Sequence, residues 1–372
     1  MKLLYAFPEP LPLPRARGLQ VVQTVRALAE QQVEVDLYHA PGAGDPFGAC
    51  DLSAPQGVNL LPLSRSLPWP LERVHSNRIF VARLARRLVA DPPDAIMVRH
   101  LKLARALLGR FAQVPLLYEA HEVFADTVPE RRRATTARLE GYVVEHAHAV
   151  VANSQATASR LGECYRPARS VHVIPNGVDV RSAIAEKDWA HCGERIVYAG
   201  SFFDWKGVDD LVVAARELPG LRISLLGGDE NSIRWLRMQA AAGGAELEFS
   251  GRVSPRHVAQ ALDEACIAVL PNRADADSVF TSPIKLFEYM AAGCAIVASD
   301  LPAVREILAE DEAVWFRPGD AQALAVALRS LAADAGLARA LSARVRIKAR
   351  QYTWRARGER LCLLLRSMAP RA

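Results

Sequence analysis

The sequence predicts an α/β protein with two Rossmann-like domains, each built on a parallel sheet. Short apolar runs alternate with helical patterns along the whole chain, and this series starts again near residue 195. A parallel sheet with crossover helices requires such an alternation. The chain has 372 residues, which is more than one compact core of ordinary size holds. Its 51% hydrophobic and 23% charged residues are ordinary for a globular protein.

The first series of apolar runs predicts a domain over residues 1–178. Its strands are expected at 3–7, 33–40, 95–98, 115–122, 149–154 and 171–179, with helices near 19–30, 101–111 and 130–146. The boundary falls after PNGVD, because Asn176-Gly177 is a strong turn signal and the following IAEKDWAHCGE is polar and irregular.

The second series predicts a domain over residues 179–352. Its strands are expected at 195–200, 221–228, 247–253, 267–271, 295–299 and 313–320. A ligand would then lie in a cleft between the domains, at the carboxyl ends of both sets of strands. The last segment, 353–372, is typical of a basic amphipathic helix, and its periodicity leaves open which domain it packs on.

Cysteine and charge patterns narrow the class of protein. The six cysteines include no C-x-x-C pair, which argues against a zinc ribbon or a disulfide framework and favours a reducing cytosol. No run of eighteen apolar residues and no signal-peptide core occurs, so we expect a cytoplasmic protein, either free or peripheral at the inner face of the membrane. Residues 63–138 hold fourteen Arg/Lys against seven Asp/Glu, and residues 344–372 hold nine against one. Such basic patches favour an anionic partner, which is either a phosphate substrate or an acidic lipid surface, or they are simply solvated helix faces. We expect no nucleic acid as a partner.

The stretch SPIKLFEYMAAGCAIVASD, residues 282–300, predicts an anion site. Ser282 suits the N-cap of a helix and Pro283 its first position, so free amides and the helix dipole face what lies ahead. Lys285 adds a full charge, and Glu288 follows on the same helix face. The apolar run after Gly293 has the composition of a buried strand.

A second phosphate-binding candidate is YAGSFFDWKGVDDLVVAA, residues 198–215. Lys206 stands before a helix and can reach a phosphate over the turn at Gly200, although a lysine in a polar loop is usually only solvated. In LEFSGRVSPRHVAQAL, backbone near Arg252 and Val253 can hold a flat base, or this is an ordinary strand-to-helix turn with a good cap.

Two candidates lie in the first domain. His121, in YEAHEVF, ends a buried strand and would project into the cleft, although a lone histidine is more often structural. Gly18 is a single glycine between a strand and a helix, which is not a dinucleotide fingerprint but allows close backbone approach of a substrate.

The histidines of EHAH, residues 145–148, point to different helix faces, so we assign no metal ligand. Around residues 79–90, Ile79, Phe80, Leu84 and Leu88 can form an apolar face beside Arg83, Arg86 and Arg87, for core packing or for membrane contact.

Together, RARGLQVVQTVRALAE, YEAHE, VANSQAT, VIPNGVD, GSFFDWKGVDDLV and SPIKLFEYMAAGCAIVASD resemble the nucleotide-sugar-dependent glycosyltransferases of family 4, which have the GT-B fold. The resemblance spans nearly the whole chain. It implies a retaining, metal-independent enzyme without a cofactor, a UDP- or GDP-sugar donor mainly on the second domain, and a glycan or lipid-linked acceptor on the first. It also implies that the final helix crosses back to the first domain.

The resemblance assigns roles to particular residues. Lys206 would neutralise the donor pyrophosphate, Glu288 would bind the ribose hydroxyls, and His121 would sit beside the transferred sugar, with Gly18 on the acceptor side. The donor-binding set it implies comprises Gly200, Ser201, Lys206, Gly227, Arg252, Val253, Ser282, Ile284, Lys285, Leu286 and Glu288.

Two positions depart from the family pattern. Phe280 stands where many members carry a second glutamate, and Ser201 stands where they carry an arginine after the glycine. Lys285 can replace the lost charge. Asp275 or Asp277 can contact the sugar in place of the missing glutamate, or their loop is a solvated connection.

The resemblance implies transfer of a sugar to a hydroxyl in the synthesis of a bacterial surface polysaccharide or glycolipid, by front-face attack of the acceptor. Front-face attack, with the leaving phosphate taking the proton, needs no covalent nucleophile, and preorganised cations stabilise the charge that develops on the pyrophosphate. The alternatives are a nucleotide-sugar epimerase, which would need a clear acid/base set, and a non-catalytic sugar-nucleotide-binding subunit.

Overall fold

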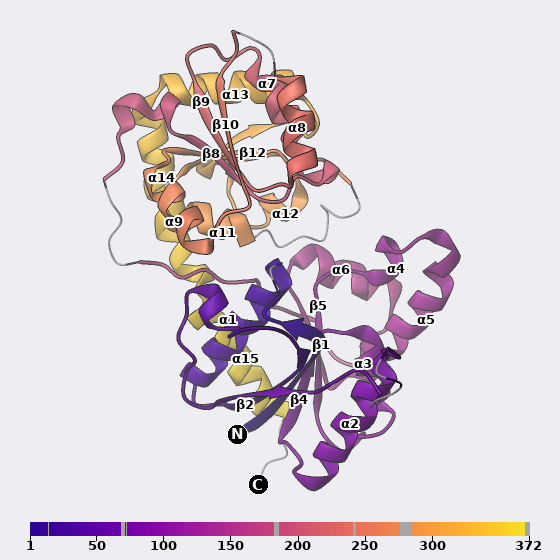
Figure 1. Cartoon of the computed structure of the whole chain (residues 1–372). Helices are drawn as coiled ribbons and strands as arrows, with labels where there is room; N and C mark the ends of the chain where they lie inside the picture. The colour runs from indigo at the N-terminus through magenta and orange to yellow at the C-terminus, as the bar shows by residue number, and fades with distance from the viewer. Residues whose placement is uncertain are drawn as a thin grey trace. The chain divides into compact units, whose positions relative to one another are not determined.

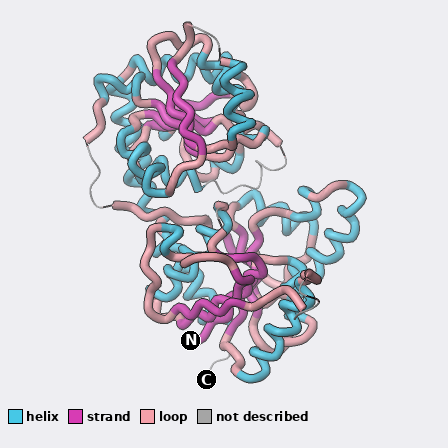
Figure 2. Tube along the Cα trace, in the orientation of Figure 1, coloured by secondary structure: helices cyan, strands magenta, loops and turns pink. Residues whose placement is uncertain are grey.

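The computed structural model describes residues 1–13, 15–67, 71, 73–181, 186–240, 243–275 and 284–368. The chain forms two compact units, one of residues Met1–Asn176 with the final segment from Trp354, and one of residues Gly177–Thr353. Each unit is a parallel sheet flanked by helices (Figures 1 and 2). The predicted α/β class with two Rossmann-like parallel sheets is therefore confirmed.

The first unit holds seven strands in the order β3-β2-β1-β4-β5-β6-β7, all parallel. The strands are β1 (Lys2–Leu11), β2 (Glu34–Pro41), β3 (Val58–Pro62), β4 (Ala95–Val98), β5 (Leu116–Ala120), β6 (Ala149–Ala152) and β7 (His172–Val173). Strands β4, β5 and β6 are buried throughout, as their continuous apolar runs require between two layers of helices.

The helices of the first unit alternate with these strands. They are α1 (Ala16–Glu30), α2 (Asn77–Ala90), α3 (Leu101–Leu108), α4 (Phe124–Thr127), α5 (Glu130–His146), α6 (Gln155–Cys164) and α15 (Trp354–Met368). Phe80, Leu84 and Leu88 of α2 are buried. Core packing therefore accounts for most of the apolar face expected at residues 79–90.

Helix α15 packs on α1, although more than three hundred residues separate them in the sequence (Figure 1). Their closest approach is at Gly358, where a Cβ atom would lie 2.5 Å from the carbonyl oxygen of Ala27. Leu361 and Leu365 of α15 join the core of the first unit. The last helix is thus an integral part of the first unit.

The second unit holds six parallel strands in the order β10-β9-β8-β11-β12-β13. The strands are β8 (Ile196–Ala199), β9 (Arg222–Leu226), β10 (Glu246–Gly251), β11 (Ile267–Leu270), β12 (Ala295–Ser299) and β13 (Val314–Phe316). The helices are α7 (Val208–Ala215), α8 (Glu230–Gln239), α9 (Pro255–Glu264), α11 (Ile284–Ala291), α12 (Pro302–Arg305), α13 (Ala321–Ala333) and α14 (Ala335–Ala349). Two apolar clusters fill the two faces of this sheet.

Strands at the edges of the first sheet differ from the sequence-based expectation. Strand β3 was not predicted, because it is an edge strand whose half-exposed residues lack a continuous apolar run. The strand expected over 171–179 is reduced to the two residues of β7. Pro175 has no N–H to donate, so the ladder cannot continue through it.

Candidate functional site

In each unit, the strand order reverses at one point of the sheet. The neighbours there are β1 and β4 in the first unit, and β8 and β11 in the second. Loops leave the two strands of such a pair in opposite directions, which opens a crevice at their carboxyl ends where ligands of parallel α/β sheets bind. Gly18 follows β1, and Lys206 follows β8. His121 follows β5, the neighbour of β4.

Lys206 ends a single 3-10 turn, Asp204–Lys206, between β8 and α7. Gly207 then takes a left-handed conformation, with φ of 65°, and a Cβ atom there would lie 1.9 Å from the carbonyl oxygen of Pro271. Arg273, after β11, holds this turn. Its backbone N–H donates to the Trp205 carbonyl at 2.9 Å, and its side chain forms ion pairs with Asp209 and Asp210 in the first turn of α7.

The Lys206 ammonium is half-buried and lies 3.9 Å from the centre of the Trp205 ring. The pKa of Lys206 is lowered to about 8, chiefly by burial and also by the ammonium of Lys285, while the Asp275 carboxylate opposes both effects. The Lys206 and Lys285 charges therefore act on each other, although one follows β8 and the other lies on α11. Two cations held this close favour an anion beside them.

Helix α11 carries Lys285, Glu288 and Tyr289. Lys285 Nζ lies 2.6 Å from Glu288 Oε2, as expected for charges three residues apart on a helix. The buried Tyr289 hydroxyl accepts a hydrogen bond from the Ala199 N–H at 2.8 Å and donates to the Ala199 carbonyl at 3.3 Å. Tyr289 thus fixes α11 to the end of β8, and we did not anticipate it because a core tyrosine leaves no distinctive sequence signal.

Gly200 and Gly227 end the neighbouring strands β8 and β9 in close contact. A Cβ atom on Gly227, whose φ is 123°, would lie 1.8 Å from the Gly200 carbonyl oxygen. The carbonyl of Ser201 accepts a hydrogen bond from the Tyr198 hydroxyl at 2.7 Å. Only glycine fits at Gly227, which keeps this end of the sheet free of side chains.

The remaining predicted donor residues lie on the same unit. Arg252 is exposed after β10, and Val253 is half-buried against the core. Ile284 is half-buried at the start of α11, whereas the Leu286 side chain is fully buried in the core, so only its backbone is available to a ligand. Ser282, Phe280 and Asp277 lie outside the described residues.

In the first unit, the side chain of His121 is 14% exposed, and its Nε2 atom lies 3.0 Å from Oε1 of Glu119. The two atoms are within reach but are not aligned as a hydrogen bond. The pKa of His121 is lowered to about 4, chiefly by burial and also by the Arg99 guanidinium, while Glu119 opposes both effects. The imidazole is therefore neutral at physiological pH.

Glu119 is the centre of a buried polar network that we did not predict. It is 1% exposed and accepts hydrogen bonds from the Tyr5 hydroxyl at 3.0 Å and from Gln20 Nε2 at 2.7 Å. It also forms an ion pair with Arg357 of α15. Burial alone would raise the pKa of Glu119, but His121 and Arg357 outweigh burial and hold it well below its ordinary value.

The loop after β5 is held by neighbouring elements. Asn153 Nδ2 donates to the His121 carbonyl at 3.2 Å, and the buried Glu140 carboxylate accepts from the N–H groups of Phe124 and Ala125 at the start of α4. Gly18 is buried in α1, and a Cβ atom there would lie 2.4 Å from the Leu13 carbonyl oxygen. Packing of the chain against itself already requires glycine at this position.

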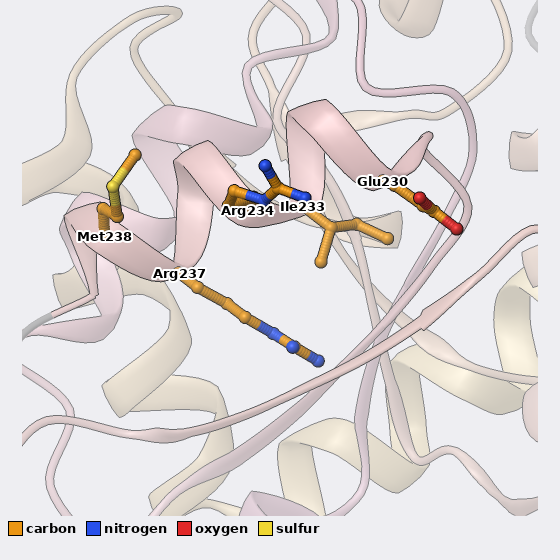
Figure 3. Close-up of a pocket in the computed structure, with 5 residues that line it drawn as sticks. All are labelled: Glu230, Ile233, Arg234, Arg237 and Met238. Atoms are coloured by element: carbon orange, nitrogen blue, oxygen red, sulfur yellow. The ribbon is translucent and has the colours of Figure 1, made fainter.

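A separate surface hollow lies on α8, lined by Glu230, Ile233, Arg234, Arg237 and Met238 (Figure 3). It contains none of the predicted site residues. Among the described residues there is no group of three or more His, Cys, Asp or Glu side chains that could hold a metal ion. The described helices include none that is long and apolar enough to span a membrane.

Two parallel-sheet Rossmann-like units in one chain give the GT-B fold, which this chain shares with sucrose-phosphate synthase. The chain belongs to glycosyltransferase family 4. Residues 18–182 match the family described as Glycosyltransferase Family 4, and residues 193–334 match the one described as Glycosyl transferases group 1.

Similar proteins include a phosphatidyl-myo-inositol mannosyltransferase of Mycolicibacterium smegmatis, which is 34% identical over 49% of this chain and 48% of the relative. The amylovoran biosynthesis glycosyltransferase AmsK of Erwinia amylovora is 28% identical over 44% of this chain and 42% of the relative. The chain thus matches about half the length of these curated relatives.

Among solved structures, sucrose-phosphate synthase from Thermosynechococcus elongatus superposes with a TM-score of 0.80 at 18% identity, covering 99% of both chains. Anabaena HepE in complex with UDP-glucose gives a TM-score of 0.74 at 18% identity, covering 99% of this chain and 100% of HepE. At this identity the likeness shows the fold.

Proposed function

We propose that this protein is a retaining, metal-independent glycosyltransferase that moves a sugar from a nucleotide diphosphate-sugar to a hydroxyl of a glycan or lipid-linked acceptor. The observation that carries the proposal is the coupled pair Lys206 and Lys285 at the carboxyl ends of β8 and β11 in the second unit. The pKa of Lys206 is lowered there by burial and by Lys285. A diphosphate is the anion best matched to two adjacent ammonium groups.

The chemistry assigned to the lysines is stabilisation of the leaving group. Negative charge grows on the pyrophosphate as the bond to the sugar breaks, so cations fixed in advance stabilise the transition state more than the ground state. Glu288 would accept hydrogen bonds from the ribose hydroxyls. Its present partner is Lys285, at 2.6 Å, so donor binding would redistribute this ion pair between the phosphate and the ribose.

The acceptor side is assigned to the first unit. His121 would contact the transferred sugar with a neutral imidazole, which can accept a hydrogen bond from a sugar hydroxyl. Relatives named as a phosphatidyl-myo-inositol mannosyltransferase and an amylovoran biosynthesis glycosyltransferase support a glycolipid or polysaccharide product. The exposed arginines of α2 and α5 suit work at an anionic membrane surface on the cytoplasmic side. That donor and acceptor meet in a cleft between the two units stays a prediction.

The first test is a thermal-shift screen with UDP-, GDP- and ADP-sugars, because a ligand that binds only the folded state raises its apparent stability. The UDP-glucose complex of HepE makes the uridine series the first choice. A shift with one base identifies the donor class, and no shift with any nucleotide contradicts the proposal.

The second test is turnover of the Lys206→Ala variant. Its kcat should fall about a hundredfold, equivalent to about 2.7 kcal/mol of transition-state stabilisation. Arg329→Ala, which removes a half-exposed cation on α13 of the same unit, is the control and should retain wild-type turnover. Near-normal turnover of Lys206→Ala rules out the role given to this lysine.

Product analysis separates the rival functions. A transferase releases nucleoside diphosphate, and its product keeps the anomeric configuration of the donor in the presence of a chelator. An epimerase would return an isomer of the donor and release no nucleotide. Binding without turnover across a broad acceptor panel would favour a non-catalytic subunit.

A further inference from the structure

We infer that Glu119 and Arg357 form a positioning pair for His121, so that the last helix of the chain controls the orientation and charge of this histidine. The inference rests on the proposed function, in which His121 contacts the transferred sugar. In this role, neither Glu119 nor Arg357 touches a substrate. Both act through the imidazole ring.

The contacts of Arg357 show that it is committed to this network. Its side chain is 2% exposed and forms an ion pair with Glu119. Its Nη1 donates to the carbonyl oxygens of Ile174 at 2.7 Å and Pro175 at 2.9 Å, and its Nε donates to Thr24 Oγ1 at 3.3 Å. A guanidinium with this many fixed acceptors is not available to bind an anionic substrate.

The Glu119 carboxylate is held equally firmly. Oε2 accepts from the Tyr5 hydroxyl, while Oε1 accepts from Gln20 and Arg357 and lies 3.0 Å from His121 Nε2. A carboxylate at this distance favours the tautomer with its proton on Nε2, which leaves Nδ1 as a hydrogen-bond acceptor. Catalytic hydrogen bonds often become aligned only when substrate is bound, so the present misalignment is compatible with this role.

The charges around the imidazole come from three elements. Glu119 lies on β5, which His121 directly follows, Arg99 follows β4, and Arg357 comes from α15, while the Tyr5 hydroxyl of β1 contacts Glu119. Glu119 favours the imidazolium, and the two guanidinium groups disfavour it. Removing Arg357 should therefore raise the pKa of His121, whereas removing the Glu119 charge should lower it. If the pair had a purely structural role, the two substitutions would not shift the pKa of His121 in opposite directions.

The test is an NMR titration of His121 in the full-length protein labelled with ¹⁵N at histidine. We expect Arg357→Gln to raise the midpoint and Glu119→Gln to lower it, with Arg357→Lys close to wild type. The control is Arg355→Gln on the same helix, whose side chain is 77% exposed and which should leave the midpoint unchanged. An unchanged midpoint, or shifts in the same direction in the two variants, would overturn the inference.

Turnover gives a second readout. Glu119→Gln should lower kcat about tenfold to a hundredfold through misplacement of the ring, while KM for the nucleotide-sugar stays near wild type. If Arg357→Gln fails to fold, the double variant Glu119→Gln/Arg357→Gln removes both charges together, and its midpoint should lie between that of Glu119→Gln and the wild type, because Glu119 affects the pKa of His121 more than Arg357 does. A midpoint displaced as far as in either single variant contradicts the pairing.

Different results would contradict the positioning role of the pair and the proposed glycosyltransferase function. Full transfer by His121→Ala would remove the catalytic meaning of the pair and leave the nucleotide-sugar chemistry of the second unit untouched. No transfer by the wild-type protein with any donor would contradict the proposed function, while the opposed NMR shifts would still test the electrostatic coupling. Normal kcat in Glu119→Gln together with an inactive His121→Ala would overturn the positioning role alone.

Discussion

Lys206 shows how burial can change the pH range of a phosphate-binding residue. Its pKa is lowered from 10.5 to about 8, so the free protein loses this positive charge as the pH rises through about 8, below the range of an ordinary lysine. Affinity for a nucleoside diphosphate should therefore be full below about pH 8 and fall as the pH rises through it. Calorimetric titration with UDP, or with the nucleotide that the screen selects, checks this between about pH 6.5 and 9.5. Lys206→Arg should bind with little change over the same range.

His121 predicts a pH dependence of stability in a different range. Its pKa of about 4 lies below the ordinary value of 6.5, so the unfolded chain binds more protons between these values. The stabilisation from keeping this group neutral is full above pH 6.5 and is lost as the pH falls toward 4, with a slope of about 1.4 kcal/mol per pH unit at most. Urea unfolding at pH 7 and pH 5 measures it. His121→Asn should lose less stability over this interval, and an equal loss would contradict the assignment.

The sequence predicted some of these residues and missed others for a physical reason. Lys206, Lys285, Glu288 and His121 stand beside glycine turns, helix starts and strand ends, so local patterns indicate them. The partners Glu119 and Arg357 lie 238 positions apart. Nothing local indicates that a glutamate in an apolar strand and an arginine in an amphipathic helix meet in one buried ion pair.

At the scale of elements, one tyrosine connects the two parts of the candidate donor site. Tyr289→Phe would remove the hydroxyl that hydrogen-bonds to the buried Ala199 N–H and carbonyl at the end of β8. The variant should lose about 1–3 kcal/mol of unfolding free energy. Chemical denaturation measures this loss. Tyr352→Phe, at a half-buried ring that stacks on Phe287, is the control and should lose less.

Helices and strands with continuous apolar periodicity were the most predictable elements. The helix expected near 130–146 is α5, Glu130–His146, and the strand expected at 95–98 is β4, Ala95–Val98. Strand β3 was not predicted, since an edge strand buries only part of its surface. The packing of α15 on α1 was implied by the family resemblance, whereas periodicity left its partner open.

At the scale of the molecule, the two units differ in how the chain builds them. The second unit is continuous, Gly177–Thr353, whereas the first combines residues from both ends of the chain. A fragment of residues 177–353 should fold alone and unfold cooperatively, since all its strands and both apolar clusters lie within it. Scanning calorimetry with and without the selected nucleotide checks this. A fragment that shows no transition, or none that nucleotide shifts, would contradict the independence of this unit.

A matched fragment of residues 1–176 should fail the same test. It lacks α15 and therefore leaves Glu119 buried without Arg357, a change that typically costs about 3–5 kcal/mol. It also exposes the face of α1 that Leu361 and Leu365 cover. Co-expression with residues 354–372 as a separate chain should restore cooperative unfolding, and a fully stable fragment without the helix would contradict this expectation.

The placement of Arg357 also has a consequence for biosynthesis. The ribosome releases the N-terminal strands first, but the guanidinium that neutralises Glu119 belongs to a helix that is translated after the whole second unit. The first unit therefore cannot reach its final form before the second unit has been synthesised, while the second can fold earlier. Translation products that stop before α15 would consequently lack the finished surroundings of His121.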